Sequence, residues 1–517
     1  MYNVTTFFLL FMVATAVAIV IRRFHIPYTV ALVLTGLLLG FLHAIEAPHL
    51  TKALLFTVFL PGLIFEAAFH IDFQQFWRNR LTIFSLAVPG VIAAIALTTF
   101  FLTPVAEVLS YGSTFTWHYA LVFGALISAT DPIAVVATFK KLGAPKRLSL
   151  ILEGESLLND GTGIVFFTLS LAFLAGKGMT VGVVTLNFIA IVGVGLLIGT
   201  VTGLIVSQIS RRIDDAMIEI ALTAIAAYGA FIAAEQLHSS GVIAAVTAGL
   251  FCGNYGTRIG MSPSSRIAIE SFWEYVAFAL NSIVFLLIGF EVSIDALLSA
   301  WKMILVAYLI VTLGRIIVVF GASALMKFTR EKIPWSWSIV LSWGGLRGAL
   351  PMVLVLSIPR DVPSRDLLVT MTFGVVLLSL LIHGLSISPL LRWLGIVRGS
   401  GERKALEFAR GKLLAAYAAL STLNQMSKDR LQKSSIVPTL RQEYDEMIQS
   451  IEQQMEKIQP EHEQLDVEET KWVRRHLLLV EKRRVIETFH EGRMDHEIYE
   501  KLLGDIDARL LKVETEL

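Results

Sequence analysis

Residues 153–163 read EGESLLNDGTG and lie within an apolar segment, 149–174, that is long enough to cross a membrane. A carboxylate at the middle of a bilayer costs roughly 2.5–3.5 kcal/mol on insertion scales, and such acids usually face a water-filled pathway. This segment contains Glu153, Glu155 and Asp160, and a neighbouring apolar segment contains Asp131 within ATDP, residues 129–132. The sequence therefore predicts a cation site shared by two membrane helices.

The composition predicts a membrane protein with many spans. Hydrophobic residues make up 55% of the 517 residues, charged residues make up only 16%, and the mean hydropathy is +0.68. These values exclude an ordinary soluble globular protein. We expect the lipid bilayer to surround the chain and expect no nucleic-acid partner.

About thirteen apolar segments approach the length of roughly 20 residues that a spanning helix needs. We therefore predict an all-α fold with about thirteen transmembrane helices. The predicted spans are 4–21, 29–42, 53–69, 81–103, 117–140, 149–174, 181–209, 216–237, 241–254, 267–290, 301–326, 335–358 and 367–393.

The positive charges between the spans predict the orientation. With the N-terminus outside, the inward loops carry 15 Lys and Arg residues and the outward loops carry 5. Cytoplasmic loops are enriched in Lys and Arg. The sequence thus predicts an external N-terminus and a cytoplasmic C-terminus in a cell (inner) membrane.

The last segment, residues 396–517, differs from the membrane domain, residues 1–395. It is rich in Glu, Lys, Gln, Arg and Leu, and its apolar residues recur at helical spacing, as in Leu413, Tyr417 and Leu420. We expect a helical cytoplasmic domain. It either aids assembly as a solvated hairpin or regulates the protein or its dimer, and it has no nucleotide-binding glycine motif.

Side-chain spacing favours one cavity for the polar groups of segment 149–174. Glu155 and Asn159 are four residues apart, as are Ser156 and Asp160, so these side chains lie on adjoining faces of one helix. Carboxylate, hydroxyl and carbonyl oxygens suit a hard cation. The sequence therefore predicts oxygen ligands from this helix.

The second acid lies beside a helix breaker. Pro132 lacks an N–H group and disfavours the α conformation at Asp131, so the helix is expected to break near Thr130. Broken helices of transporters expose carbonyl groups and half-helix dipoles where coupling ions bind. Asp131 either binds the cation with Asp160 or caps a half-helix.

Two arginines lie inside apolar segments, and each needs a partner. They are Arg315 and Arg347, the latter within GGLRGA, residues 344–349. If an arginine neutralises Glu155, Asp160 remains as the titrating group, because burial favours the neutral form of an unpaired carboxylate. The alternative is that both arginines belong to structural ion pairs without a transport role.

A few other polar residues give weaker signals. Glu66 is a candidate for lining the pathway, and Glu270 and Glu274 are weaker candidates near a helix end. His383 is inside the last span, where a lone histidine is more often packed than functional.

The combination of motifs resembles the monovalent cation:proton antiporter family of the bacterial NhaP and animal sodium/proton exchanger type. The motifs are ATDP (129–132), ESLLND (155–160), FLLIGFE (285–291) and GGLRGA (344–349), and they occur in family order over about residues 1–395. The resemblance implies a homodimer whose protomers have a dimerisation subdomain and a core subdomain, with inverted repeats and two crossed, interrupted helices.

The resemblance also implies the roles of individual residues. Asp160 would be the ion- and proton-binding carboxylate, with Asp131, Ser156 and Thr130 completing the site. Glu155, Asn159, Arg315 and Arg347 would support it, with Arg315 as the preferred partner of Glu155. Asn159 occupies the place where electrogenic relatives carry a second aspartate, so electroneutral one-for-one exchange is implied.

The predicted function is therefore secondary transport that exchanges sodium, or lithium, for protons by competition at Asp160, without a cofactor and without enzymatic activity. A potassium/proton antiporter of the same family is the main alternative. A cation channel is less favoured, because the sequence has no re-entrant filter signature. An intramembrane aspartyl protease is also less favoured, because its Tyr-Asp and Gly-x-Gly-Asp signatures are absent from the predicted membrane spans.

Overall fold

A computed structural model describes residues 4–21, 27–42, 52–109, 111, 115–176, 181–213, 215–256, 263–329, 331–397, 400–428, 436–458, 463–490 and 493–515. These residues form helices joined by turns and short loops, with no strand among them, which confirms the all-α prediction. The chain divides into two compact units, Met1–Arg398 and Gly399–Leu517.

Apolar helices coincide with every predicted span. In the described part of the chain, eight helices are long and apolar enough to cross a membrane, and the shorter apolar helices are Phe8–Ile21, Tyr28–Phe41, Phe56–His70 and Gly241–Gly256. The remaining predicted span, 335–358, corresponds to the helix pair α18 (Trp335–Trp343) and α19 (Ala349–Leu356). The number of helices that cross the membrane and their inverted-repeat relation stay predictions.

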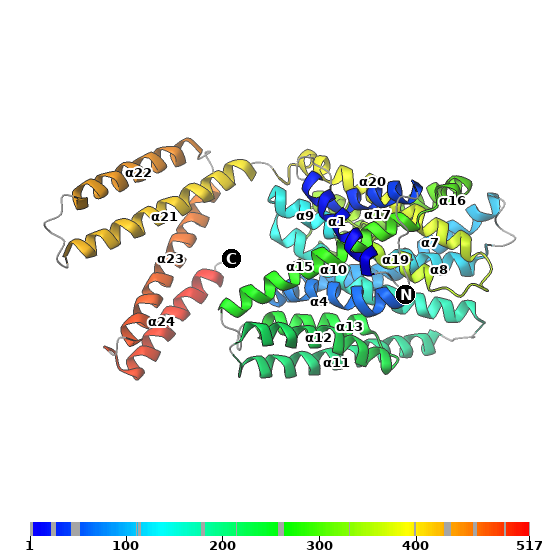
Figure 1. Cartoon of the computed structure of the whole chain (residues 1–517), viewed down its shortest axis with the longest axis horizontal. Coiled ribbons are helices and arrows are strands. Elements are labelled where there is room, and N and C mark those ends of the chain that lie inside the picture. The colour runs from blue at the N-terminus through cyan, green and yellow to red at the C-terminus, as the bar shows by residue number, and fades with distance from the viewer. Residues whose placement is uncertain are drawn as a thin grey trace. The chain divides into compact units, whose positions relative to one another are not determined.

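One group of helices in the first unit forms a layer packed through small residues. Figure 1 shows α11 (Val181–Ser210), α12 (Ala216–Gln236) and α13 (Gly241–Phe251) running side by side. They pack with α4 (Leu60–His70) and α15 (Pro263–Glu291) around a core of small alanines and large aromatics. Its fully buried members include Phe65, Trp273, Ala226, Ala230 and Ala244.

The other group of helices in the first unit includes the two interrupted helices. It contains α7 (Val91–Val108), α8 (Trp117–Ser128), α9 (Ile133–Leu142), α10 (Lys146–Leu174), α17 (Trp301–Met326), α18, α19 and α20 (Arg365–Trp393). α10 packs against α8, while α20 contacts α8, α9, α17, α18 and α19. This packing places the polar residues of α10 beside the break between α8 and α9.

The rest of the first unit completes these two groups. α1 (Val4–Ile21) and α2 (Tyr28–Phe41) pack against α15, and α3 (Lys52–Leu54) continues through the π-helical stretch η1 (Leu55–Phe59) into α4. α6 (Arg80–Ser85) continues through η2 (Leu86–Gly90) into α7, and η3 (Cys252–Gly256) extends α13.

Two short helices were not predicted from the apolar pattern. α5 (Phe73–Arg78) begins where the Asp72 carboxylate accepts hydrogen bonds from the main-chain N–H groups of Gln74 and Gln75. α16 (Ile294–Ser299) begins in the same way with Ser293, whose hydroxyl accepts from the N–H of Ala296. A side chain caps the N-terminus of each helix. The capping residues, and not a long apolar segment, explain why these two helices form.

The second unit consists of two helical hairpins. α21 (Ser400–Lys428) packs with α22 (Ile436–Ile458), and the Tyr417 hydroxyl hydrogen-bonds to Glu452 at 3.0 Å. α23 (Glu463–His490) packs with α24 (His496–Thr515), where Arg509 pairs with Glu481 at 2.9 Å. The predicted helical character of the tail is confirmed.

Candidate cation and proton site

The first interrupted helix breaks between α8 and α9. α8 ends at Ser128, Ala129 is extended with φ −63° and ψ 137°, and α9 begins at Ile133. The cause is Pro132, which offers no N–H to the helix and disfavours the α conformation at the residue before it. The predicted break at Thr130 and Asp131 is thus present.

Side chains of α10 hold the unwound residue Thr130. The Asn159 amide donates to the Thr130 hydroxyl at 2.7 Å, and its oxygen accepts from the Thr130 N–H at 3.3 Å. The Ser156 hydroxyl donates to the Thr130 carbonyl oxygen. These bonds satisfy main-chain groups that the break removed from helical pairing, and they bring Thr130, Ser156 and Asn159 together as predicted.

Asp131 and Asp160 are more exposed than the neighbouring Glu155 and Asn159. Asp131 and Asp160 are half-buried, whereas Asn159 and Glu155 are 0% and 1% exposed. The two carboxylates are near enough to interact electrostatically. The two acids therefore keep some accessible surface, whereas Glu155 and Asn159 are fully packed.

Asp131 also has the structural role that the sequence left open. One carboxylate oxygen, Oδ1, accepts a hydrogen bond from the Ile133 N–H at 3.0 Å, which satisfies a free donor at the start of α9. A carboxylate has two oxygens and several acceptor positions. The cap thus leaves acceptor capacity on Asp131 for a cation.

The second interrupted helix breaks between α18 and α19 and crosses the first break. The Asp131 N–H donates to the carbonyl oxygen of Leu346 at 2.7 Å. At Gly348 an added Cβ would overlap the Asp131 side chain. Glycine is needed at this point because the two unwound segments touch, and the predicted crossing of the interrupted helices is therefore observed.

Arg347 is buried, with 5% exposure, and holds the end of α8. Its Nη1 donates to the carbonyl oxygens of Ser128 and Ala129 at 3.1 and 3.3 Å. Carbonyls at a helix C-terminus carry partial negative charge and attract cations. The partner that we expected for Arg347 is therefore a pair of main-chain carbonyl oxygens. Every residue has such an oxygen, so the sequence alone does not predict this contact.

Arg315 and Glu155 form the predicted ion pair. The guanidinium binds the carboxylate through both Nη atoms, with Nη2 to Oε2 at 3.0 Å, and Nη2 also donates to the Leu341 carbonyl at 2.9 Å. The two side chains are 11% and 1% exposed. This bidentate geometry links α10, α17 and α18 and neutralises Glu155.

Three of the weaker candidates have partners of their own. Glu66 forms a pair with His70, with Oε1 to Nδ1 at 3.2 Å, and Glu270 forms a pair with Arg266 at 2.7 Å. His383 is buried and hydrogen-bonded to Tyr308 at 3.0 Å. Sequence reasoning did not find Tyr308 or Ser379, which accepts from the Arg347 N–H at 3.1 Å.

Comparison with known proteins identifies the family. The sodium/hydrogen exchanger transmembrane model matches residues 8–393. The chain belongs to the sodium/hydrogen exchanger family. It is accordingly a multi-pass membrane antiporter and not an enzyme, as the sequence predicted.

Individual relatives of the exchanger cover the chain to different extents. The chain is 32% identical to the Na(+)/H(+) antiporter NhaG of Bacillus atrophaeus, over 98% of this chain and 97% of the relative. It is 34% identical to the Na(+)/H(+) antiporter NhaH of Halobacillus dabanensis, over 75% of this chain and 97% of the relative.

A solved exchanger structure has the same fold. The sodium proton antiporter MjNhaP1 of Methanocaldococcus jannaschii superposes with a TM-score of 0.64 at 19% identity, over 75% of this chain and 98% of that structure. The predicted resemblance and fold class are confirmed by these matches.

Proposed function

We propose that this exchanger moves sodium ions and protons in opposite directions at one site formed by Asp160, Asp131, Ser156 and Thr130. The observation that carries the proposal is the position of Asp131 where the two unwound segments touch, with Asp160 on the neighbouring α10 near enough to interact with it electrostatically. Oxygen ligands of this kind bind hard cations. The carboxylates are also the groups that bind protons.

The charges around the site favour exchange of one sodium ion for one proton. Glu155 and Arg315 neutralise each other, and Arg347 adds one positive charge against the two negative charges of Asp131 and Asp160. The empty site then carries one net negative charge. Binding of either one sodium ion or one proton brings that charge to zero.

Asn159 supports the same stoichiometry. Its side chain is fully buried, and both ends of the amide are hydrogen-bonded to Thr130. A side-chain amide does not ionise and does not bind or release a proton near neutral pH. The position therefore adds no second titrating acid, which favours an electroneutral cycle.

Transport follows from the cost of moving charge through a low-dielectric region. A neutral, occupied site can move with the helices that hold it, whereas the empty anionic site bears the full desolvation cost. Only the occupied forms exchange between the two sides, so sodium and proton movements are coupled without ATP. The motion would be a rocking of the core subdomain around the site.

The proposal includes the surroundings of the exchanger. Residues 1–395 would form the antiporter domain in a cell (inner) membrane, as a homodimer with the N-terminus outside, and residues 396–517 would form a cytoplasmic domain. Lipid contact is supported by exposed apolar side chains such as Phe100, Leu197 and Ile225, which are 72%, 64% and 61% exposed. The orientation is supported by the distribution of Lys and Arg described above.

The test is transport by the purified full-length protein in liposomes that contain a pH-sensitive dye. Sodium, potassium and lithium are added separately, with and without a potassium clamp on the membrane potential. We expect sodium or lithium to drive proton movement that does not respond to the potential. Exchange driven by potassium alone would replace the sodium proposal with the potassium alternative.

Asp160→Asn tests the site itself. The amide cannot bind a proton reversibly or supply charge to the cation, so exchange should be abolished while the protein stays folded. Retained exchange by a well-folded Asp160→Asn protein would refute the assignment of this carboxylate.

A further inference from the structure

Helix α20 presents a row of polar side chains to the second interrupted helix. Ser379, His383 and Ser386 are spaced by four and three residues, so they lie on one face of α20. Ser379 and His383 are only 2% and 4% exposed. Polar groups are costly to bury in an apolar span unless they are hydrogen-bonded, so their partners indicate what this face of α20 does.

These side chains hold both ends of the unwound segment between α18 and α19. Ser386 accepts a hydrogen bond from the indole N–H of Trp343, the last residue of α18, at 2.7 Å. The ring of His383 packs on the same indole with 4.4 Å between centroids. At the other end of the segment, Ser379 accepts from the main-chain N–H of Arg347 at 3.1 Å.

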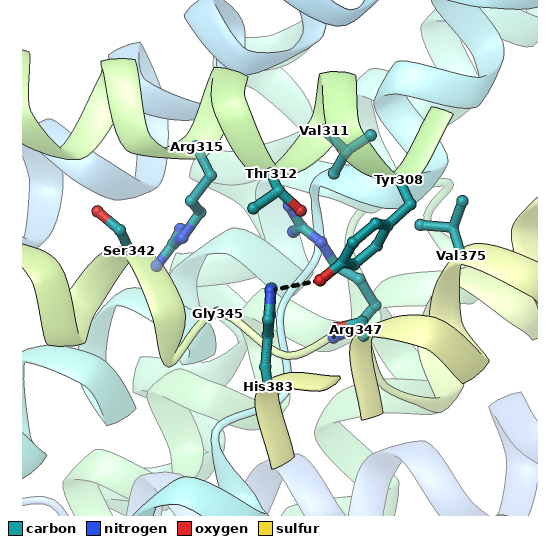
Figure 2. A pocket seen from close by; sticks show the side chains of 10 residues that line it. Tyr308, Val311, Thr312, Arg315, Ser342, Gly345, Arg347, Val375 and His383 are labelled. Atoms are coloured by element: carbon teal, nitrogen blue, oxygen red, sulfur yellow. Dashed lines mark hydrogen bonds between the residues drawn. The ribbon is translucent and has the colours of Figure 1, made fainter. Parts of the chain in front are cut away.

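A small cavity lined by both polar and apolar residues lies between α20, α17 and this segment. Figure 2 shows side chains converging on it, with the His383 Nε2 atom bonded to the Tyr308 hydroxyl. Its polar lining includes Tyr308, Arg315, Ser342, Arg347, Ser379 and His383. The centre of a water molecule can occupy about 10 Å³ of the cavity, which corresponds to about one water.

Two polar atoms of this lining lack a hydrogen bond among the described residues. They are Nε of Arg315 and Nδ1 of His383, and both are buried. Buried polar atoms are nearly always paired with protein or with ordered water. A cavity of this size, lined by the two residues that carry these atoms, has room for one bound water.

We propose that α20 positions the cation site, with Ser379 and His383 as positioning residues and a water in this cavity joining His383 to Arg315. The inference rests on the proposed function. Ser379 fixes the main chain at Arg347, and the adjacent Leu346 carbonyl accepts from the Asp131 N–H. Arg347 in turn holds the carbonyls that precede Thr130.

The first test is sodium kinetics of Ser379→Ala in liposomes at equal amounts of folded full-length protein. The apparent KM for sodium should rise about fivefold, the loss expected for one neutral hydrogen bond, and the pH profile should shift. Ser379→Thr keeps the hydroxyl and should restore the apparent KM for sodium and the pH profile of the unaltered protein. Ser388→Ala is the matched control, because residue 388 lies on the opposite face of the same helix, and it should leave both unchanged.

Tyr308→Phe provides a milder second variant, since it removes only the oxygen that bonds His383. It should also raise the apparent KM for sodium about fivefold. If folded Ser379→Ala and Tyr308→Phe both show the KM and pH profile of the unaltered protein, the positioning role is refuted.

The water is tested by an experimental structure that resolves ordered solvent. We expect density within hydrogen-bond distance of both Arg315 Nε and His383 Nδ1, and an empty cavity would refute the water link. Asp160→Asn separates the two proposals. Unchanged kinetics of the α20 variants beside an inactive Asp160→Asn would remove only the positioning inference, whereas an active Asp160→Asn would remove the proposed site.

Discussion

The main-chain N–H of Asp131 donates a hydrogen bond to the carbonyl oxygen of Leu346 across 2.7 Å. The bond joins the unwound parts of two different helices, and each supplies a partner that the other lost when its helix was interrupted. Main-chain polar groups at membrane depth must be satisfied inside the protein. The two breaks therefore form one structural unit, and a change at either should alter the cation site.

The buried pair of Glu155 and Arg315 should be a major contributor to stability. Glu155→Gln or Arg315→Ala alone leaves an uncompensated buried charge, at a cost of about 3–5 kcal/mol. The double variant removes both charges, so its loss should be smaller than the sum of the two single losses. Thermal melting of the three variants measures this difference, and simple additivity would contradict the coupling.

The chain offers a matched control for this cycle. Arg266 and Glu270 form a pair of similar type at 2.7 Å, but their side chains are 54% and 35% exposed. Exposed pairs at this helical spacing contribute only about 0.3–0.5 kcal/mol. The corresponding single and double variants should therefore melt close to the unaltered protein.

Gly348→Ala should abolish or strongly reduce exchange. The new Cβ would overlap the Asp131 side chain, and overpacking of this kind costs about 1–3 kcal/mol and displaces neighbouring groups. Exchange and melting temperature are measured together in liposomes and detergent. Normal exchange by Gly348→Ala would mean that the two breaks can separate without loss of the site.

Gly321→Ala in α17 is the control for a glycine that has space around it. Apart from the backbone of its own helix, no atom of the described residues lies within 4 Å of an added Cβ there. Alanine is favoured over glycine inside a helix by about 0.8–1.0 kcal/mol, so this variant should exchange normally and melt at the same or a higher temperature.

Much of this architecture follows from local features of the sequence. Long apolar segments predict the spans, and Pro132 predicts the first break, because both effects depend on residue type. The spacing of Glu155, Ser156, Asn159 and Asp160 predicts one polar face of α10. The half-buried Asp160 and the buried Glu155, Ser156 and Asn159 are consistent with that prediction, while the cation-binding roles stay predictions.

Other contacts could not be predicted because main-chain atoms make them. The carbonyls of Ser128, Ala129 and Leu346 are bound as acceptors, and a carbonyl is present at every residue whatever its side chain. The role of Ser379 depends on which helix lies opposite it, and one sequence does not give that neighbour. A polar row at helical spacing on α20 was the available signal.

Arg347→Gln should make exchange slow and sensitive to voltage. The substitution removes the positive charge that balances one of the two carboxylates, so a site with one bound cation keeps a net negative charge as it moves. Loss of a charged hydrogen bond costs about 1.5–3 kcal/mol, which corresponds to a rate reduction of at least about tenfold. Arg347→Lys keeps the charge and should stay insensitive to voltage.

The measurement is the rate of exchange at several clamped membrane potentials. The unaltered protein provides the reference, and its rate should not depend on the potential. A voltage-insensitive Arg347→Gln protein would contradict the charge balance that we assign to the site.

Competition at one carboxylate site predicts the effect of pH on sodium affinity. At lower pH a proton occupies more of the sites, so more sodium is needed to displace it and the apparent KM rises. The limit is about tenfold per pH unit for one competing proton. Sodium titrations of proteoliposomes at a series of pH values give this slope. An apparent KM that stays constant while the maximal rate changes would indicate separate sites.

Truncation after Arg398 should leave a membrane-inserted exchanger, because every proposed ligand precedes that residue and residues 399–517 form a separate compact unit. A tail can bias the two positions of the core only through different contacts with each. We therefore expect exchange to persist while its pH dependence or the stability of the dimer changes.

The test compares exchange as a function of pH, and the melting temperature, between the full-length and the truncated protein. Loss of all exchange in a folded truncated protein would make the tail part of the transport machinery, whereas identical pH profiles and melting temperatures would leave it without a regulatory or stabilising role.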